Sequence, residues 1–119
     1  MLSESEREVV RLCVVAMAKG DLIGAWEIPI RTGYTQEELY HIAVTWSERD
    51  LNDDEFVYAV NGCLNEICHG VRISDNEMLR DCGIVREEAR RIFEKWKAYR
   101  AEALARFRAS YAEAEEDAL

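Results

Sequence analysis

The chain has 119 residues, of which 49% are hydrophobic and 33% charged, and its formal net charge at pH 7 is -9. This length can bury a real core, and the composition argues against a disordered or fibrous protein. The longest apolar stretch is too short to span a bilayer, and the N-terminus lacks the basic start and apolar core of a signal peptide. We therefore expect a helical, globular, cytoplasmic protein without a membrane partner.

The negative charge lies in residues 1–84, which carry 7 basic and 16 acidic side chains. Residues 85–119 carry eight of each, but all eight basic ones precede Ser110 and four acidic ones follow it. An acidic body repels phosphate backbones and attracts basic surfaces. The charge therefore predicts a basic protein partner and argues against nucleic acid. Solubility alone is the other explanation, and it needs no partner.

Residues 4–19 are predicted to form the first helix, which Ser3 or Ser5 can cap and Gly20 can close. Its apolar residues cover most faces, which is typical of a centrally buried helix. Residues 21–32 could hold a short helix. Pro29 restricts the residue before it, so we expect a break there.

A capping box at Thr35–Glu38 opens the next predicted helix, which we expect to end near Glu48. Asn52 or Asp53 can cap the fourth helix, whose apolar positions keep a helical spacing as far as Gly70.

A second capping box at Ser74–Glu77 predicts a short helix that ends at Cys82, with Met78 and Leu79 facing inward. The last helix begins near Val85 and keeps one apolar stripe for more than 20 residues. The stripe contains Ala89, Ile92, Phe93, Trp96, Tyr99, Ala103, Leu104, Phe107 and Tyr111. A helix this long either spans the body or overhangs it, and an overhanging apolar stripe predicts a partner such as a second copy of the chain. A homodimer through the C-terminal helix is therefore one expectation.

An offset of 50 residues aligns positions 10–46 with positions 60–96 and gives ten identities, whereas unrelated chains share roughly one position in 16. The identical pairs are Val10/Val60, Cys13/Cys63, Gly20/Gly70, Ile23/Ile73, Glu27/Glu77, Gly33/Gly83, Glu37/Glu87, Glu38/Glu88, Ile42/Ile92 and Trp46/Trp96. An internal repeat fixes the architecture before any motif does. We predict a single all-α domain of five to six helices, with pseudo-repeats at about 4–50 and 53–100 and a helical extension at 100–119.

Six residues are candidates for contact with a partner. Five of them form an acidic run that can steer and orient a basic protein. The sixth, a tryptophan in the irregular segment, can anchor a partner or pack on the body. The six are Glu48, Asp50, Asp53, Asp54, Glu55 and Trp26. Carboxylates at a helix N-terminus also stabilise the helix dipole, which is the purely structural explanation of the run.

The acidic run resembles the start of a calcium loop but fails its pattern. The sixth and twelfth positions hold Glu55 and Asn61, where the loop needs glycine and a bidentate glutamate. Cys63, Cys68, His69 and Cys82 belong to residue types that bind zinc, but they lack a closely spaced cysteine pair. We therefore predict reduced, buried cysteines and no metal or other cofactor. No motif of a catalytic nucleophile is present, so we expect a protein that is not an enzyme, with a metal-dependent enzyme as the weakest alternative.

The segments around Gly33 and Gly83 look like helix-turn-helix units. Two glutamates at the start of each second helix would face DNA phosphates badly, so a structural helix corner explains these segments better. A transcription regulator that binds DNA through the basic helix at Arg86–Arg91 remains the alternative function.

Three segments carry a resemblance: Trp46–Asp50, Val60–Asn65 and His69-Gly70. Together they resemble a pattern in small bacterial proteins that have a tryptophan followed by acidic residues, an Asn-rich helix and a His-Gly ending. Some proteins of this kind resemble immunity proteins that neutralise a cognate toxin. The resemblance implies a non-enzymatic inhibitor that covers a basic toxin with an acidic surface.

Overall fold

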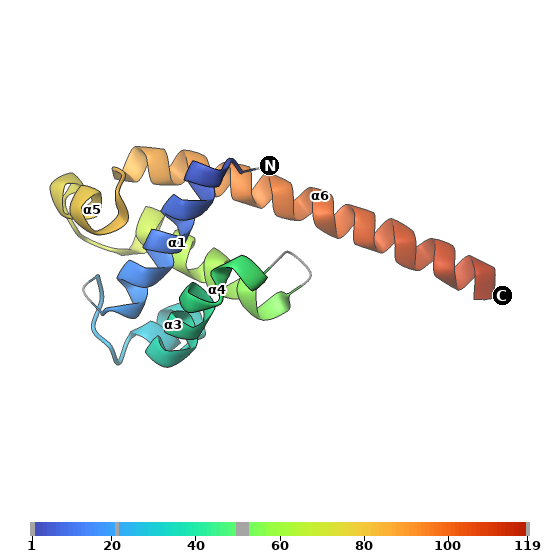
Figure 1. Ribbon diagram of the computed structural model, residues 1–119, viewed down its shortest axis with the longest axis horizontal. Coiled ribbons are helices and arrows are strands. Elements are labelled where there is room, and N and C mark those ends of the chain that lie inside the picture. Colours follow the sequence, from blue (N-terminus) through green and yellow to red (C-terminus); the bar gives the residue numbers. More distant parts are fainter. Residues whose placement is uncertain (1, 21, 50–52, 119) are drawn as a thin grey trace.

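The computed structural model describes residues 2–20, 22–49 and 53–118, except for the side chains of residues 103, 107 and 110–118. Within this part the chain forms six α-helices, two short helical turns and no strand (Figure 1). The elements are α1 (Glu4–Ala18), α2 (Ile28–Thr32), α3 (Gln36–Val44), η1 (Trp46–Glu48), α4 (Asp54–Asn65), η2 (Glu66–Gly70), α5 (Asp75–Cys82) and α6 (Arg86–Ala118). The predicted all-α fold is confirmed.

The sequence repeat is also a structural repeat. Helices α1 and α4 begin 50 positions apart, α2 and α5 end 50 apart, and α3 and α6 begin 50 apart. Gly33 and Gly83 end the second helix of each repeat with φ of 83° and 80°, a left-handed conformation that only glycine adopts without strain. Equivalent positions are buried in both copies. Examples are Val10/Val60, Cys13/Cys63, Val14/Leu64, Met17/Ile67, Ile28/Met78 and Ile42/Ile92.

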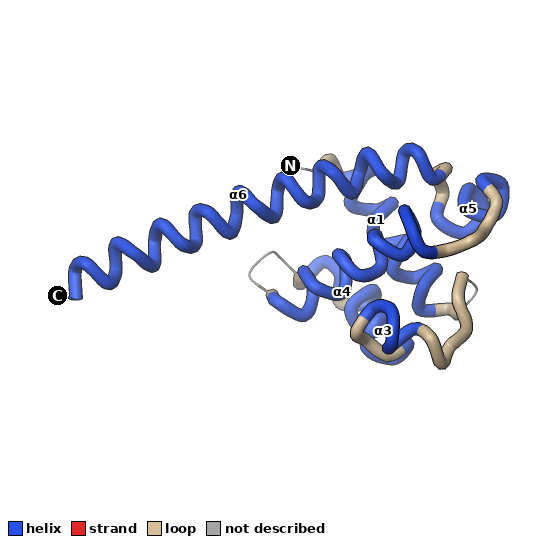
Figure 2. Tube along the Cα trace, turned by 180° about the vertical axis from the view of Figure 1, so that it is seen from behind, coloured by secondary structure: helices blue, strands red, loops and turns tan. Residues whose placement is uncertain are grey.

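The first helices of the two repeats, α1 and α4, pack against each other at the centre of the molecule. Each also contacts the short second helix of the other repeat, α1 with α5 and α4 with α2. Helix α3 lies against α1, and the first part of α6 lies against α4 and η2 (Figures 1 and 2). The core between the central helices includes Cys13, Met17, Val60 and Cys63, all with no exposed surface. The two repeats therefore share one hydrophobic core.

The predicted break at Pro29 is wrong, because Pro29 lies in the first turn of α2 and Ile28 is its first residue. The first amides of a helix have no acceptor within that helix, so proline removes no hydrogen bond there. Burial of Ile28, which has no exposed surface, outweighs the local preference against helix before proline.

Leu79 was also predicted to face inward, and this is wrong. Its side chain is 52% exposed, whereas Met78 and Cys82 on the same helix are fully buried. Successive residues of a helix point about 100° apart, so a narrow buried face on α5 can hold only one of the two neighbours.

The predicted fourth helix, which was expected to reach Gly70, changes its geometry after Asn65. Residues Glu66–Gly70 form a turn of π-helix, which the Val71 amide closes by donating to the Glu66 carbonyl at 2.7 Å. The wider turn leaves carbonyls that the helix itself does not use. Likewise α3 ends at Val44, before the predicted Glu48, and the short turn η1 follows it.

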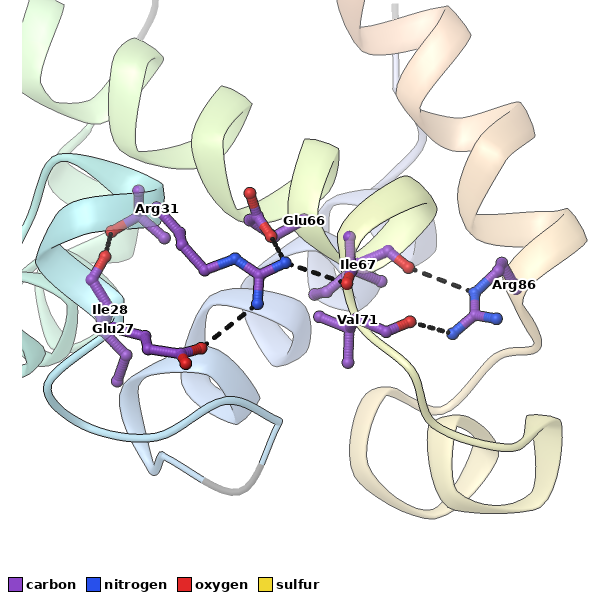
Figure 3. Close-up of polar contacts among 9 residues, drawn as sticks. Glu27, Ile28, Arg31, Glu66, Ile67, Val71 and Arg86 are labelled. Atoms are coloured by element: carbon purple, nitrogen blue, oxygen red, sulfur yellow. Dashed lines mark hydrogen bonds and ion pairs between the residues drawn. The ribbon is translucent and has the colours of Figure 1, made fainter.

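Arginines from two other elements bind backbone carbonyls in the π turn and just after it. Figure 3 shows Arg31 and Arg86 approaching the turn from opposite sides. Arg31 of α2 donates to the Gly70 carbonyl at 3.0 Å and lies 2.8 Å from Glu66 Oε2. Arg86 donates to the carbonyls of Val71 at 2.8 Å and Ile73 at 3.1 Å. The turn is thus the place where α2, α4 and α6 are joined by polar contacts.

Helix α6 is much longer than any other element. It has 33 residues, and the molecule measures 56 × 27 × 24 Å along its principal axes. Trp96, with 3% exposure, is the last buried residue among the side chains of α6 that the structure describes, and the C-terminal half of the helix stands clear of the other helices (Figures 1 and 2). The body therefore uses only the first part of α6 for its core.

Candidate functional site

The acidic run lies at the N-terminus of α4 and is organised by one arginine. Arg49 Nη1 lies 2.6 Å from Asp53 Oδ2 and 3.2 Å from Glu55 Oε1. Asp53 also caps α4, because its carboxylate accepts the Phe56 amide at 3.2 Å. Burial acts to raise the pKa of Asp53, but hydrogen bonds from Arg49 and the Phe56 amide outweigh it, so the pKa lies below its usual value. Asp53 is therefore charged at neutral pH and held in place.

Two other candidate carboxylates are free to meet a partner. Glu48 and Asp54 are exposed, and neither forms an ion pair within residues 2–20, 22–49 and 53–118. The fifth candidate, Asp50, lies outside the described residues. Glu48 is next to Arg49 in the sequence, and Asp54 lies between the two carboxylates that Arg49 binds. Both present negative charge to solvent.

The structure adds Tyr34, Glu38 and Tyr58 to this surface. Burial first, and then the nearby charges of Glu55 on α4 and Glu38 on α3, raise the pKa of Tyr34. Tyr58 is 55% exposed on α4. Tyr58 could have been predicted, because it lies four residues after Asp54 on the same helical face. Glu38 gave no such signal, because it reaches the surface only through packing of α3.

Aromatic packing fixes the position of this surface on the body. The Trp46 and Phe56 rings meet edge to face with centroids 4.9 Å apart, and Phe56 meets Trp96 in the same way at 5.9 Å. Trp96 is buried and Trp46 partly buried. Phe56 therefore joins η1, α4 and α6, and it keeps Glu48 close to the helix that carries Asp54.

Trp26 is strongly exposed but does not belong to the acidic surface. Its side chain is 72% exposed, and Ile30, one turn further on, is 74% exposed. The neighbouring Glu27 pairs with Arg31, which in turn binds Glu66 at the end of α4 opposite to Asp53. The segment before α2 also lies away from the N-terminus of α4 in Figures 1 and 2. The six candidate residues thus do not form one surface.

The cysteines have the environment of core residues. All four are free and buried. Burial raises the pKa of Cys63 to about 12 and that of Cys68 to about 11. A hydrogen bond with Cys82, followed by burial, raises the pKa of Cys13. Thiols that stay protonated at neutral pH are weak nucleophiles and weak metal ligands. In the described part of the chain, no group of three or more His, Cys, Asp or Glu side chains could hold a metal ion.

Two arginines of the basic helix are used inside the fold. Arg86 binds the carbonyls of Val71 and Ile73, and Arg90 Nε donates to the Cys68 carbonyl at 3.2 Å. These guanidinium groups stabilise the end of the π turn. Arg91 is exposed. The face predicted for DNA contact therefore presents fewer available cations than its sequence suggests.

No protein-family model matches this chain, and no curated protein or solved structure matches it significantly. None of the helices in the described part of the chain combines the length and the apolar character that crossing a bilayer requires.

Proposed function

We propose that this chain is a non-enzymatic protein-binding domain that binds a basic partner through the acidic surface at the start of α4. The observation that carries the proposal is the arrangement around Arg49, which holds Asp53 and Glu55 while Glu48 and Asp54 stay exposed. A fixed group of carboxylates steers a basic protein and sets its orientation.

An exposed aromatic side chain supports this proposal. Tyr58 is 55% exposed and lies one turn beyond Asp54 on α4. Tyrosine is enriched among the residues that contribute most to protein–protein binding, because its ring offers contact area and its hydroxyl offers a hydrogen bond. The surface thus combines charge for steering with an aromatic anchor at its edge.

A toxin-immunity protein is the narrower form of the proposal. It draws on the sequence resemblance and on the charge, since toxins that act on nucleic acid are commonly basic and an acidic inhibitor can cover them. DNA binding through Arg86–Arg91 stays a prediction, and the use of Arg86 and Arg90 inside the fold does not favour it. Self-association through the C-terminal helix is a separate proposal.

The test compares two variants with the same change in net charge. Glu48→Lys with Asp54→Lys reverses two free carboxylates of the acidic surface, whereas Glu4→Lys with Asp75→Lys reverses two exposed ones elsewhere. Glu4, Asp75 and Asp54 are each the first residue of an α-helix, so the control variant disturbs two helix N-termini and the surface variant one. Asp53 is left intact because it caps α4.

The partner to test is the purified basic protein encoded next to this chain, with binding measured by calorimetry at two salt concentrations. We expect a salt-sensitive complex that the surface variant weakens by about tenfold or more and the control variant leaves nearly unchanged. Absence of a complex with a neighbouring toxin, or equal weakening by both variants, would contradict the proposal. Retardation of duplex DNA that is lost in Arg91→Glu would support the alternative.

A further inference from the structure

From residue 101 onward, α6 projects away from the other helices. Among the described side chains, Arg100 makes the last polar contacts of α6 with the body, with Nη1 3.2 Å from Asn61 Oδ1 and the guanidinium 5.7 Å from the centre of the Tyr58 ring. Beyond it, every described side chain of α6 is exposed, namely those of Ala101, Glu102, Leu104, Ala105, Arg106, Arg108 and Ala109. Figures 1 and 2 show this part of the helix, residues 101–118, projecting from the body; we call it the overhang.

The overhang carries an apolar stripe in its sequence. Ala103, Leu104, Phe107 and Tyr111 recur at intervals of one, three and four positions, which places them on one face of a helix. The Leu104 side chain is 43% exposed. A helix of this length is marginally stable alone in water, and burial of an apolar face is what usually stabilises it.

The charges of the overhang give a second and independent observation. Positions 113–117 hold four carboxylates and no cation, in the last turns of the helix. The negative end of the helix dipole lies there and disfavours them. Positions 109–114, which are three or four residues before these carboxylates, hold no cation. Cations that could balance the acidic end must therefore come from outside this helix end.

Three basic residues lie in the same helix, nearer the body. Arg100, Arg106 and Arg108 precede the acidic end, with Glu102 as the single acidic residue between positions 100 and 108. Their own helix cannot bring them to positions 113–117, because a helix holds these positions apart along its axis. A second copy running in the opposite direction can do so.

We propose that two copies of this chain associate through their overhangs in an antiparallel pair, with the acidic end of each beside the basic stretch of the other. A pairing centred on position 109 places position 107 beside position 111 of the second copy and position 118 level with position 100. Positions 113–117 then lie level with positions 101–105 of the second copy, between its Arg100 and Arg106. The paired stretch is then about 27 Å long and ends where the body begins. A parallel pair would place like charges side by side, so charge selects the antiparallel direction. The same surface of both copies is used, which gives a closed two-fold dimer.

Sedimentation of the full chain over a range of concentrations tests the pairing. We expect a dimer that Leu104→Asp weakens by about tenfold or more, because a charge then lies within the apolar stripe. Val44→Asp is the matched control, since Val44 is 77% exposed on the body. Both variants should keep the circular dichroism and unfolding midpoint of the body. A chain that stays monomeric at all concentrations, or a dimer that Leu104→Asp leaves unchanged, overturns the proposal.

Cysteine crosslinking tests the direction of the pair, because the four native cysteines are buried. Under mild oxidation by glutathione disulfide, a mixture of Ala101→Cys and Asp117→Cys chains should form mixed dimers if the helices are antiparallel. Efficient crosslinking of Ala101→Cys with itself would show a parallel pair and overturn the proposal. These outcomes do not involve Glu48 or Asp54, so the acidic-surface proposal can fail or stand independently.

Discussion

The two repeats have matching helix starts but different ends. Helix α3 stops at Val44, whereas its equivalent α6 continues to Ala118. The contacts inside the repeats also differ at equivalent positions. Gln36 of α3 donates one bond to the Ala18 carbonyl at 2.9 Å, while Arg86, its equivalent, binds the carbonyls of Val71 and Ile73. The repeated pattern thus sets the helices, and the differing residues decide which contacts join them.

The contact of each first helix with the far repeat shows the same contrast. Glu6 of α1 pairs with Lys95 of α6 at 2.7 Å. The equivalent of Glu6 is Phe56, which packs against Trp46 of η1 instead. One contact is therefore ionic and lies at the surface, and the other is aromatic and partly buried. The second should contribute more to stability, because surface ion pairs contribute little.

The largest expected difference between the repeats is at the two tryptophans. We expect Trp96→Ala to lower the free energy of unfolding by about 3–5 kcal/mol, because its side chain is buried and leaves a cavity. Trp46→Ala should cost about half as much, since Trp46 is only partly buried. Denaturant unfolding followed by circular dichroism measures both values. Equal losses would show that the repeats are more alike in their packing than the structure indicates.

The next difference concerns the contact of α4 with α2. A Cβ on Gly62 would lie 2.9 Å from the Thr32 carbonyl oxygen and 3.3 Å from Thr32 Cα, so α2 must move to admit it. Gly62→Ala should therefore lower the free energy of unfolding by about 2–3 kcal/mol, despite the better helix propensity of alanine. Asn65→Ala, an exposed site on the same helix, is the control and should change it by less than about 0.5 kcal/mol. A neutral Gly62→Ala variant would mean that the two helices are not in close contact.

A smaller difference is expected between the polar contacts of Arg86 and Gln36. Arg86→Met keeps an apolar stem but leaves the Val71 and Ile73 carbonyls without this donor, which should cost about 2 kcal/mol. Gln36→Met removes a single bond to the Ala18 carbonyl and should cost about 1 kcal/mol. Thermal and denaturant unfolding of both variants give the comparison. The reverse order would show that the π turn does not depend on Arg86.

The smallest effect concerns the exposed pair of Glu6 and Lys95. The hydrogen bond from Lys95 lowers the pKa of Glu6 from its usual 4.5 to about 2. Because the folded pKa is below the unfolded one, the contribution to stability is present above pH 4.5 and is lost as the pH falls toward 2. Glu6→Gln keeps the reciprocal bonds of the capping box but removes the charge, so its stability should change less over this pH range. Unfolding midpoints measured between pH 5 and pH 2 test this, and parallel curves for both proteins would contradict it.

Much of the fold could be predicted from local signals. The capping boxes at Thr35 and Ser74, the glycines at positions 33 and 83 and the spacing of apolar residues all act within a few residues of chain. The break at Pro29 failed because the burial of Ile28 depends on distant helices. The prediction that the fourth helix continues to Gly70 failed for the same reason, since the arginines that bind the carbonyls of the π turn come from α2 and α6.

The candidate site was predicted only in part. The acidic run was visible because its residues are close in sequence. The role of Arg49 could also have been found, since it precedes Asp53 by four residues. The addition of Glu38 and Tyr34 needed the tertiary structure, because the charges that act on Tyr34 come from Glu55 on α4 and Glu38 on α3. The exclusion of Trp26 needed the path of the chain through α2, which takes it to the other end of α4.

The sequence by itself determined the helices, their caps and the repeat, because hydrogen bonding within a helix and the period of 3.6 residues act locally. It also determined the separation of charge between an acidic body and a mixed C-terminal helix. Only the tertiary structure decided which carboxylates share a surface, which arginines are used inside the fold and where α6 leaves the body. These depend on contacts between residues far apart in the chain, such as Arg31 with Gly70 and Arg100 with Asn61, whose geometry no local pattern encodes.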